Sequence, residues 1–154
     1  MADVHALHDR YIEAMNDRDW TAFRSIVTPD YYEDWPQSGE RVVGIENFRQ
    51  IFENYPGGAT GPLAQESRVF ARGDQWAMTP SFTTIRVSGR DDLFTSVSAA
   101  RYPDGSLWYL VAIVEVRDGL MAKSTRYWAP TYPAPDWRSA WTEPMPPEAA
   151  PRTP

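Results

Sequence analysis

The chain has 154 residues, an aromatic content of 14% and a formal net charge of −6. This length is typical of one domain and is sufficient to bury a core without disulfides or metal ions. The sequence has no cysteine, which excludes disulfides, thiolate metal ligands and thiol nucleophiles. Its acidic balance disfavours nucleic acid and anionic membranes as partners. With no leader-like segment and no long apolar run, we expect a cytoplasmic protein.

Three amphipathic segments in the first third of the chain are predicted to be helices, because their apolar residues recur every three or four positions. They cover about residues 3–16, the stretch from Trp20 to Val27, and the stretch from Ile45 to Tyr55. Asp19 is placed as the N-cap of the second helix, which Thr28-Pro29-Asp30 is expected to end. Gly44 precedes the third helix, and Pro56-Gly57-Gly58 follows it.

The chain beyond residue 62 has a different pattern, in which β-branched and aromatic residues form runs separated by turn dipeptides. The candidate strands are about 65–72, 75–87, 93–102, 107–117 and 120–128, and a short aromatic run at 31–35 precedes them. Pro103-Asp104-Gly105 and Asp118-Gly119 are strong hairpin signals and indicate an antiparallel sheet. Helices followed by strands predict an α+β fold with the helices on one face of a curved sheet.

The chain after Ala129 holds eight of the fourteen prolines. Trp137 and Trp141 lie four residues apart behind Pro135, a spacing that predicts a short helix docking both indoles onto the domain. The alternative is a fully disordered tail. We therefore expect one domain over residues 1–143 and a proline-rich, disordered tail over 144–154.

Several short motifs resemble the nuclear transport factor 2-like superfamily. They are the stretch 10–20, the run Asp30-Tyr31-Tyr32-Glu33-Asp34-Trp35, the helix opened by Gly44, and the turn at 116–120. Within this superfamily the segments 35–41, 53–57 and 126–128 are most similar to SnoaL-like proteins of an uncharacterised subgroup. The superfamily includes ketosteroid isomerases, polyketide cyclases and small epoxide hydrolases. The resemblance implies a cone-shaped, cystatin-like α+β barrel, in which three N-terminal helices pack on a curved, mostly antiparallel sheet of five to six strands around a pocket.

The resemblance to ketosteroid isomerases implies a catalytic site. It places Tyr11 at the oxyanion-binding tyrosine and Asp34 at the general base, whereas the isomerases' third acidic position is Ala112 or Ile113 here, with Glu115 nearby. A carboxylate at the mouth of an apolar cavity loses hydration, so its pKa rises toward neutrality. Asp34 is thus the first candidate base, Tyr11 the oxyanion donor and Glu115 a second pocket carboxylate.

Each of these three residues also has a structural interpretation. Asp34 is then a solvated carboxylate at a strand end, Tyr11 a core tyrosine, and Glu115 a residue on the outer face of its strand. Aromatic and arginine residues expected to line the pocket are Trp35, Tyr55, Trp76, Phe82, Arg101, Tyr109, Arg126, Tyr127 and Trp128.

We expect neither a cofactor nor a metal. The sequence has no glycine-rich phosphate loop and no Gly-x-Ser-x-Gly elbow, and His5 and His8 lack a third histidine or a cysteine. The predicted function is a cofactor-independent isomerase, cyclase or hydrolase that acts on a small apolar or polycyclic metabolite by carboxylate acid/base chemistry. The alternative is a non-catalytic module that binds a small molecule or a protein. The expected partners are a small-molecule ligand and a second copy of the chain in a homodimer, without nucleic acid or membrane.

Overall fold

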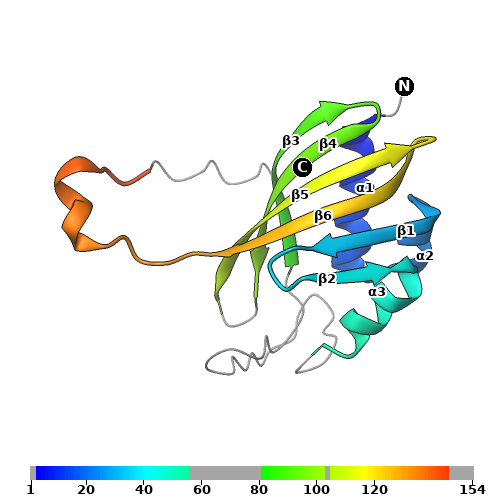
Figure 1. The fold of residues 1–154 in the computed structure, drawn as a ribbon, viewed down its shortest axis with the longest axis horizontal. Helices are drawn as coiled ribbons and strands as arrows, with labels where there is room; N and C mark the ends of the chain where they lie inside the picture. Colours follow the sequence, from blue (N-terminus) through cyan, green and yellow to red (C-terminus); the bar gives the residue numbers. More distant parts are fainter. Residues whose placement is uncertain (1–2, 56–80, 103–104, 146–154) are drawn as a thin grey trace.

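The computed structural model describes residues 3–55, 81–102 and 105–145. Helices α1 and α2 come first, strands β1 and β2 precede helix α3, and four further strands and a 3-10 helix complete the described chain (Figure 1). They are α1 (Val4–Asp17), α2 (Trp20–Arg24), β1 (Val27–Trp35), β2 (Glu40–Val43), α3 (Gly44–Glu53), β3 (Ser81–Arg90), β4 (Leu93–Arg101), β5 (Leu107–Arg117), β6 (Leu120–Pro130) and η1 (Asp136–Trp141). The predicted α+β fold with three N-terminal helices is confirmed.

The six strands form one curved sheet in the order β2-β1-β6-β5-β4-β3. Neighbouring strands are antiparallel except for β1 and β6, which run parallel with Glu33 opposite Ser124. The parallel pair joins segments about 90 residues apart, so residues of β1 and β6 can build one site. Within the described residues β2 and β3 remain the two edges, and the expected barrel is a sheet that does not close.

Local sequence chemistry explains how the first two helices begin. The side chain of Asp3 accepts hydrogen bonds from the backbone N–H groups of His5 and Ala6, and Asp19 does the same for Thr21 and Ala22. Each aspartate satisfies donors that the first helical turn leaves without partners. The predicted N-cap at Asp19 is confirmed.

The second helix is shorter than predicted. It ends at Arg24, and the segment Thr28-Pro29-Asp30, expected to stop the helix, lies inside β1. The pairing of β1 with β6 is irregular between Val27 and Tyr32, so the missing N–H of proline does not interrupt a regular ladder. The strand β2 was also not expected. Strand β3 ends at Arg90, beyond the predicted strand 75–87, whose first six residues lie outside the described residues, as does the whole predicted strand 65–72.

Side-chain amides attach outlying elements to their neighbours in two places. Asn16 of α1 donates to the carbonyl of Phe82 at 3.0 Å and accepts from its N–H at 2.8 Å, which fixes the start of β3. Gln37, in the turn between β1 and β2, donates to the carbonyl of Trp128 at 2.7 Å and accepts from its N–H. Each amide pairs with the N–H and the carbonyl of one residue, as a neighbouring strand would. Phe82, Gln37 and Trp128 all line the cavity described below.

The chain after β6 leaves the body of the fold (Figure 1). A short 3-10 helix forms where a helix was predicted, but its indoles do not dock, since Trp137 is 75% and Trp141 79% exposed. The expectation of docking is wrong for this segment. Pro130, Pro133 and Pro135 favour an extended backbone, which carries the chain away from the sheet instead of back onto it.

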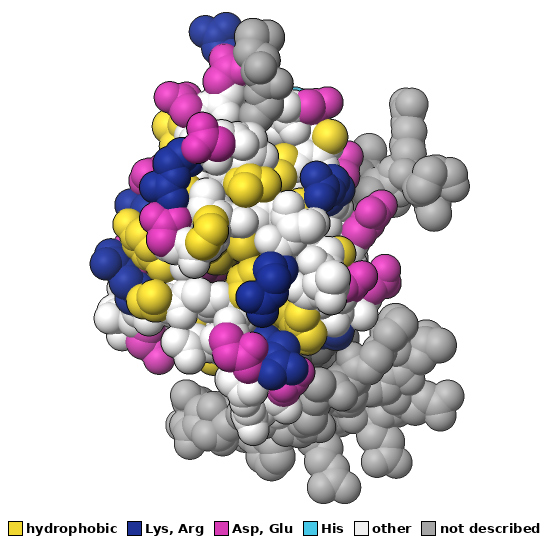
Figure 2. All heavy atoms as spheres, turned by 90° about the vertical axis from the view of Figure 1, so that its right-hand side faces the viewer, with side chains coloured by type: hydrophobic (Ala, Val, Ile, Leu, Met, Phe, Trp, Pro, Cys, Tyr) yellow, Lys and Arg dark blue, Asp and Glu magenta, His cyan; other side chains and the backbone are white. Residues whose placement is uncertain are grey.

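Charges of both signs interleave with hydrophobic side chains on the face shown in Figure 2. No helix in the described part of the chain has both the length and the apolar character needed to cross a membrane.

Candidate functional site

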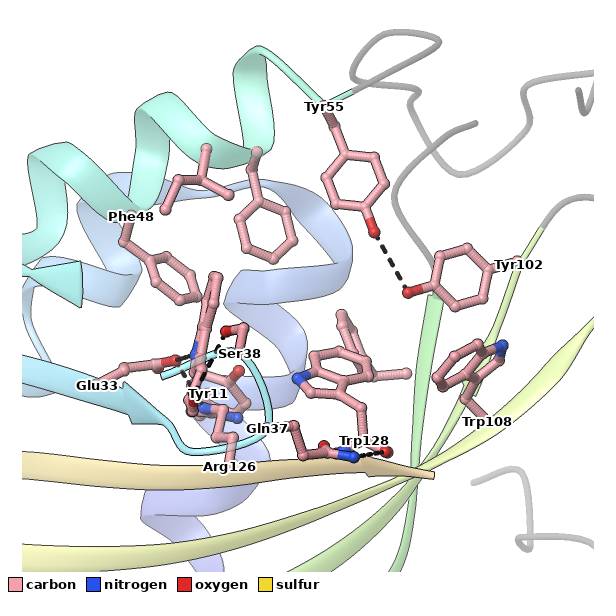
Figure 3. Close-up of a pocket in the computed structure, with 14 residues that line it drawn as sticks. Tyr11, Glu33, Gln37, Ser38, Phe48, Tyr55, Tyr102, Trp108, Arg126 and Trp128 are labelled. Atoms are coloured by element: carbon pink, nitrogen blue, oxygen red, sulfur yellow. Dashed lines mark hydrogen bonds and ion pairs between the residues drawn. The ribbon is translucent and has the colours of Figure 1, made fainter. Parts of the chain in front are cut away.

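A cavity of about 330 Å³ lies between the sheet and the helices α1 and α3 (Figure 3). Most of its wall is aromatic, and a few polar groups are gathered in it. The lining residues are Tyr11, Glu33, Trp35, Gln37, Ser38, Phe48, Ile51, Phe52, Tyr55, Phe82, Tyr102, Trp108, Arg126 and Trp128. A small cavity with mostly apolar walls and a few converging polar groups is the usual form of a small-molecule site.

Glu33 is the carboxylate that faces this cavity. It lies on β1 between Tyr31 and Trp35, and strand alternation puts all three side chains on the inner face. The hydroxyl of Tyr31 donates to Oε1 at 2.5 Å, and the indole N–H of Trp35 donates to Oε2 at 3.1 Å. Glu33 is fully buried, so these donors replace the water that a carboxylate would otherwise keep.

Arg126 supplies the opposite charge from the neighbouring strand β6. Its Nε lies 2.9 Å from Oε2 of Glu33, and its guanidinium lies over the ring of Tyr11, 4.6 Å from the ring centroid. Burial by itself lowers the pKa of Arg126, but the charge of Glu33, together with the neighbouring Tyr11 and Tyr31, outweighs that effect and holds the pKa above its usual range. Arg126 is therefore a permanent cation. We call Tyr11, Glu33 and Arg126 the polar cluster.

The two phenols beside this ion pair stay protonated. Burial raises the pKa of Tyr11 well above its usual range, and the charge of Arg126 opposes that rise only in part. Burial, reinforced by the charge of Glu33, also raises the pKa of Tyr31 well above its usual range. Beside the ion pair of Glu33 and Arg126, the cavity thus contains in Tyr11 a neutral phenol that can donate a hydrogen bond.

A second polar group in the cavity is formed by Tyr55, just beyond α3, and Tyr102, just beyond β4. Their hydroxyl oxygens lie 3.3 Å apart. Burial raises the pKa of Tyr55, so its hydroxyl is neutral at physiological pH. In Figure 3 these two residues lie across the cavity from Glu33 and Arg126. We call Tyr55 and Tyr102 the tyrosine pair.

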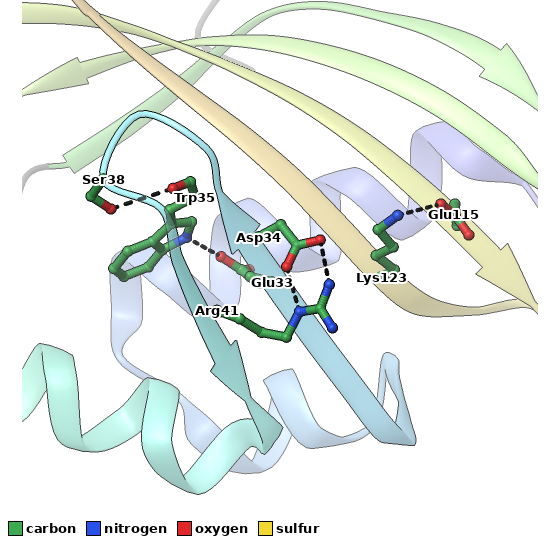
Figure 4. A network of polar contacts seen from close by, with 7 residues as sticks. All are labelled: Glu33, Asp34, Trp35, Ser38, Arg41, Glu115 and Lys123. Atoms are coloured by element: carbon green, nitrogen blue, oxygen red, sulfur yellow. Dashed lines mark hydrogen bonds and ion pairs between the residues drawn. The ribbon is translucent and has the colours of Figure 1, made fainter.

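The structure places Asp34 outside the cavity (Figure 4). Its carboxylate accepts hydrogen bonds from Nε and Nη2 of Arg41 at 2.6 and 3.0 Å. These hydrogen bonds lower the pKa of Asp34, so the expected rise toward neutrality is wrong. Glu33 and Asp34 are consecutive in a strand, and only one of them can face inward.

Glu115 lies on the same outer face of the sheet. It is exposed, and its carboxylate is 3.0 Å from Nζ of Lys123, which leaves it outside the cavity (Figure 4). The inner positions next to it on β5 are Val114 and Val116, both buried. Of the three residues predicted to be catalytic, Tyr11 alone lines the cavity.

Some of the residues predicted to line the pocket do line it and others do not, and for those on strands the alternation of side chains decides which. Trp35, Tyr55, Phe82, Arg126 and Trp128 lie in the cavity wall. Three predicted residues are absent from the cavity wall: Arg101, Tyr109 and Tyr127. Each is next to an inward residue on its strand and therefore faces outward, and Arg101 and Tyr127 are exposed. Trp76 lies outside the described residues.

Glu33 was missed as a site residue, although its signal was present. In Tyr31-Tyr32-Glu33-Asp34-Trp35 the alternate positions 31, 33 and 35 share a face, and two of them are large aromatic residues. A carboxylate between two large aromatic residues on one strand face requires partners, and this marks Glu33 and not Asp34. No comparable sequence pattern pointed to the remaining lining residues, which are Gln37, Ser38, Tyr102, Trp108 and the α3 residues Phe48, Ile51 and Phe52.

No group of three potential metal ligands gathers anywhere in residues 3–55, 81–102 and 105–145. His5 is exposed, whereas His8 is buried with its Nε2 3.1 Å from the hydroxyl of Thr84.

A curved sheet that holds an apolar pocket against three helices defines the cone-shaped, nuclear transport factor 2-like class of α+β domains. The sequence model of the SnoaL-like domain matches residues 8–124, and the chain belongs to this family. No curated protein matches the chain.

Solved structures agree with this assignment. An NTF-2 like protein of unknown function from Burkholderia xenovorans is 26% identical with a TM-score of 0.68, and the match covers 93% of this chain and 95% of that one. A proposed ketosteroid isomerase from Kribbella flavida is 23% identical with a TM-score of 0.69, covering 93% and 90%. IdmH, a proposed polyketide cyclase from Streptomyces antibioticus, is 14% identical with a TM-score of 0.56, covering 82% and 91%. The last two similarities concern the fold.

Proposed function

We propose that the chain binds a small, flat, largely apolar molecule in the cavity and transfers a proton on it without a cofactor, as an isomerase or cyclase. The observation that carries this proposal is the polar cluster, a buried carboxylate beside a fixed cation and a neutral phenol in an otherwise aromatic cavity. Such groups are arranged to act on a carbonyl compound whose neighbouring carbon carries an acidic proton.

Each group of the polar cluster has a defined role. Glu33 accepts the proton from the carbon next to the carbonyl, the electron pair of that C–H bond forms a C=C bond, and the π pair of the C=O bond moves onto the carbonyl oxygen. Arg126 and Tyr11 donate hydrogen bonds to this oxygen as its negative charge develops. The aromatic walls exclude water, which strengthens both interactions.

The fate of the proton distinguishes the two reactions. In an isomerisation Glu33 returns the proton to another carbon of the same conjugated system. In a cyclisation the enolate carbon forms a bond with a second carbonyl carbon of the molecule, and Glu33 returns the proton to the new alkoxide. The names of the Kribbella and Streptomyces proteins support this range by analogy of fold.

A second candidate function is ligand binding without catalysis. Both oxygens of Glu33 already have partners, Tyr31 on Oε1 and Trp35 and Arg126 on Oε2. In this alternative Glu33 only holds Arg126 in place, and Arg126 binds an oxygen of the ligand.

Deuterium exchange into 2-tetralone, a flat ketone with acidic α-protons, separates the two candidates. Followed by NMR in D₂O, wild-type protein should accelerate the exchange, and Glu33→Gln should reduce the acceleration about 100-fold or more while 2-tetralone still binds. Asp34→Asn is the matched control and should exchange at the wild-type rate. Binding of 2-tetralone without accelerated exchange would support the binding module instead.

A further inference from the structure

The described wall of the cavity reaches the protein surface at the turn between β1 and β2. Among the lining residues that the structure describes, Gln37 and Ser38 are exposed, whereas all the others are buried or half-buried. Both lie in the turn 36–39, which connects the paired residues Trp35 and Glu40. Within the described chain, a ligand in solution therefore meets the cavity first at this turn.

Backbone pairing between β1 and β6 stops just before this turn. The ladder of the two parallel strands ends with Asp34 opposite Thr125. The next link between them is the side chain of Gln37, whose amide donates to the carbonyl of Trp128 at 2.7 Å and accepts from its N–H (Figure 3). One side chain thus holds the turn 36–39 against the end of β6.

The two hydrogen bonds of Gln37 are of a kind that opens readily. Both are exposed, and water replaces each partner when they break, so opening costs far less than breaking a buried hydrogen bond. The bonds from the N–H groups of Ser38 and Gly39 to the carbonyl of Trp35 lie within the turn itself and remain. The turn can therefore move away from β6 without unfolding.

The groups behind this link are those that the ligand must reach. Trp35 and Trp128 line the cavity on the two sides of the link. Arg126 of the polar cluster lies two residues before Trp128 on the same face of β6. Opening the link separates the two sides of the wall next to the ion pair, which gives a flat molecule a direct path to the polar cluster.

We propose that ligands enter and leave the cavity between the turn 36–39 and the end of β6, and that Gln37 is the latch of this mouth. The latch closes both in the free protein and over a bound ligand, so it controls the rates of binding and release more than the affinity. The inference rests on the proposed binding of a small molecule in the cavity.

Stopped-flow fluorescence with 2-naphthol, a flat probe with one oxygen, tests the latch. Gln37→Ala removes both bonds to Trp128 and should raise the association and dissociation rate constants about tenfold each, because the mouth is then open more often before and after binding. The affinity should change far less than either rate. Gln50→Ala is the matched control: it removes an exposed amide of α3 outside the cavity wall and should retain both wild-type rates.

The outcomes separate this inference from the proposed function. Binding of 2-naphthol to Gln37→Ala with wild-type rate constants would overturn the latch and leave the binding site intact. A change in only one of the two rate constants would also overturn it, because Gln37 would then contact the ligand instead of closing the mouth. Failure of 2-naphthol to bind the wild type would overturn the proposed binding and this inference together.

A second measurement locates the mouth even if Gln37→Ala does not fold. The sequence has no cysteine, so Ser38→Cys provides a single thiol in the turn. Coupling of this thiol to a bulky maleimide should slow the association of 2-naphthol about tenfold or more. The same coupling in Ser88→Cys, at an exposed position of β3, should leave the rate unchanged. An unchanged rate in the labelled Ser38→Cys protein would place the mouth elsewhere and overturn the inference.

Discussion

Arg126 and Glu33 form an ion pair, with 2.9 Å between Nε and Oε2, in which neither side chain is more than 4% exposed. The pair exists because β1 and β6 run side by side and because both residues occupy inward positions of their strands. Two charges removed from water in this way stabilise a fold only if each keeps its partner. The cluster is therefore sensitive to the loss of either member.

Arg126→Met should lower the free energy of unfolding by about 3–5 kcal/mol, because Glu33 would be left buried without its counter-ion. The double variant Glu33→Met/Arg126→Met should recover most of this loss, since it leaves no unpaired charge. Urea denaturation of the wild type, Arg126→Met, Glu33→Met and the double variant measures the coupling. Arg41→Met, which breaks the outer pair with Asp34, is the control and should have a far smaller effect. An Arg126→Met loss no larger than that of the control would contradict the account.

Asp34→Asn should leave the affinity for 2-naphthol unchanged. Asp34 faces outward, and Arg41 holds its pKa below the usual range, so the carboxylate is ionised and paired throughout the neutral range. Calorimetric titration of the variant against wild type checks this. A clear loss of affinity in Asp34→Asn would contradict the placement of the binding site on the inner face of β1.

About half of the site follows from sequence reasoning, and the other half does not. Asp19 was placed correctly because N-capping depends on residues within one helical turn. Tyr11 was found through a resemblance that covers a helix. Asp34 was chosen over Glu33 because the resemblance placed the base at position 34, although the shared face of positions 31, 33 and 35 favours Glu33.

Non-local contacts explain the other misses. The four-residue strand β2 has too short a pattern to predict, and it forms because β1 lies beside it from Tyr32 to Trp35. Phe48, Ile51 and Phe52 have the helical spacing of core residues, and a cavity wall has the same spacing as a core. The two indoles of the tail were expected to dock because large apolar side chains usually do.

His8 should make the stability of the protein depend on pH. Burial, with smaller contributions from the charges of Arg126 and His5, lowers the pKa of His8 from 6.5 to about 4. Between these values the unfolded chain binds a proton that the folded chain does not. The free energy of unfolding should therefore fall by up to about 3 kcal/mol as the pH is lowered from 6.5 to 4.

The variant His8→Gln isolates this contribution from that of the carboxylates. In urea denaturation at a series of pH values, its loss of stability between pH 6.5 and 4 should be smaller than that of the wild type. His5→Gln changes an exposed side chain on the same helix and removes only the smallest of the three effects on His8, so it should retain most of the wild-type slope. Parallel curves for the wild type and His8→Gln would show that His8 does not lose its proton on folding.

The double variant Trp137→Ser/Trp141→Ser should change the free energy of unfolding by no more than about 0.5 kcal/mol, because both indoles are exposed. Trp20→Ala is the comparison. Trp20 packs against Phe48 and Phe52, with ring centroids 6.3 and 5.8 Å away, and its loss should cost about 3 kcal/mol. A tail variant as unstable as Trp20→Ala would mean that the indoles pack on the domain.

The most direct test of the cavity as the binding site is an NMR titration of protein with isotope-labelled isoleucine methyl groups against 2-naphthol. Ile51 lines the cavity, whereas Ile113 is 40% exposed outside it. We predict that the methyl resonances of Ile51 shift and show NOEs to the naphthol ring, while those of Ile113 do not change. NOEs from the naphthol to Ile113 and none to Ile51, or no change at either residue at millimolar 2-naphthol, would contradict the account.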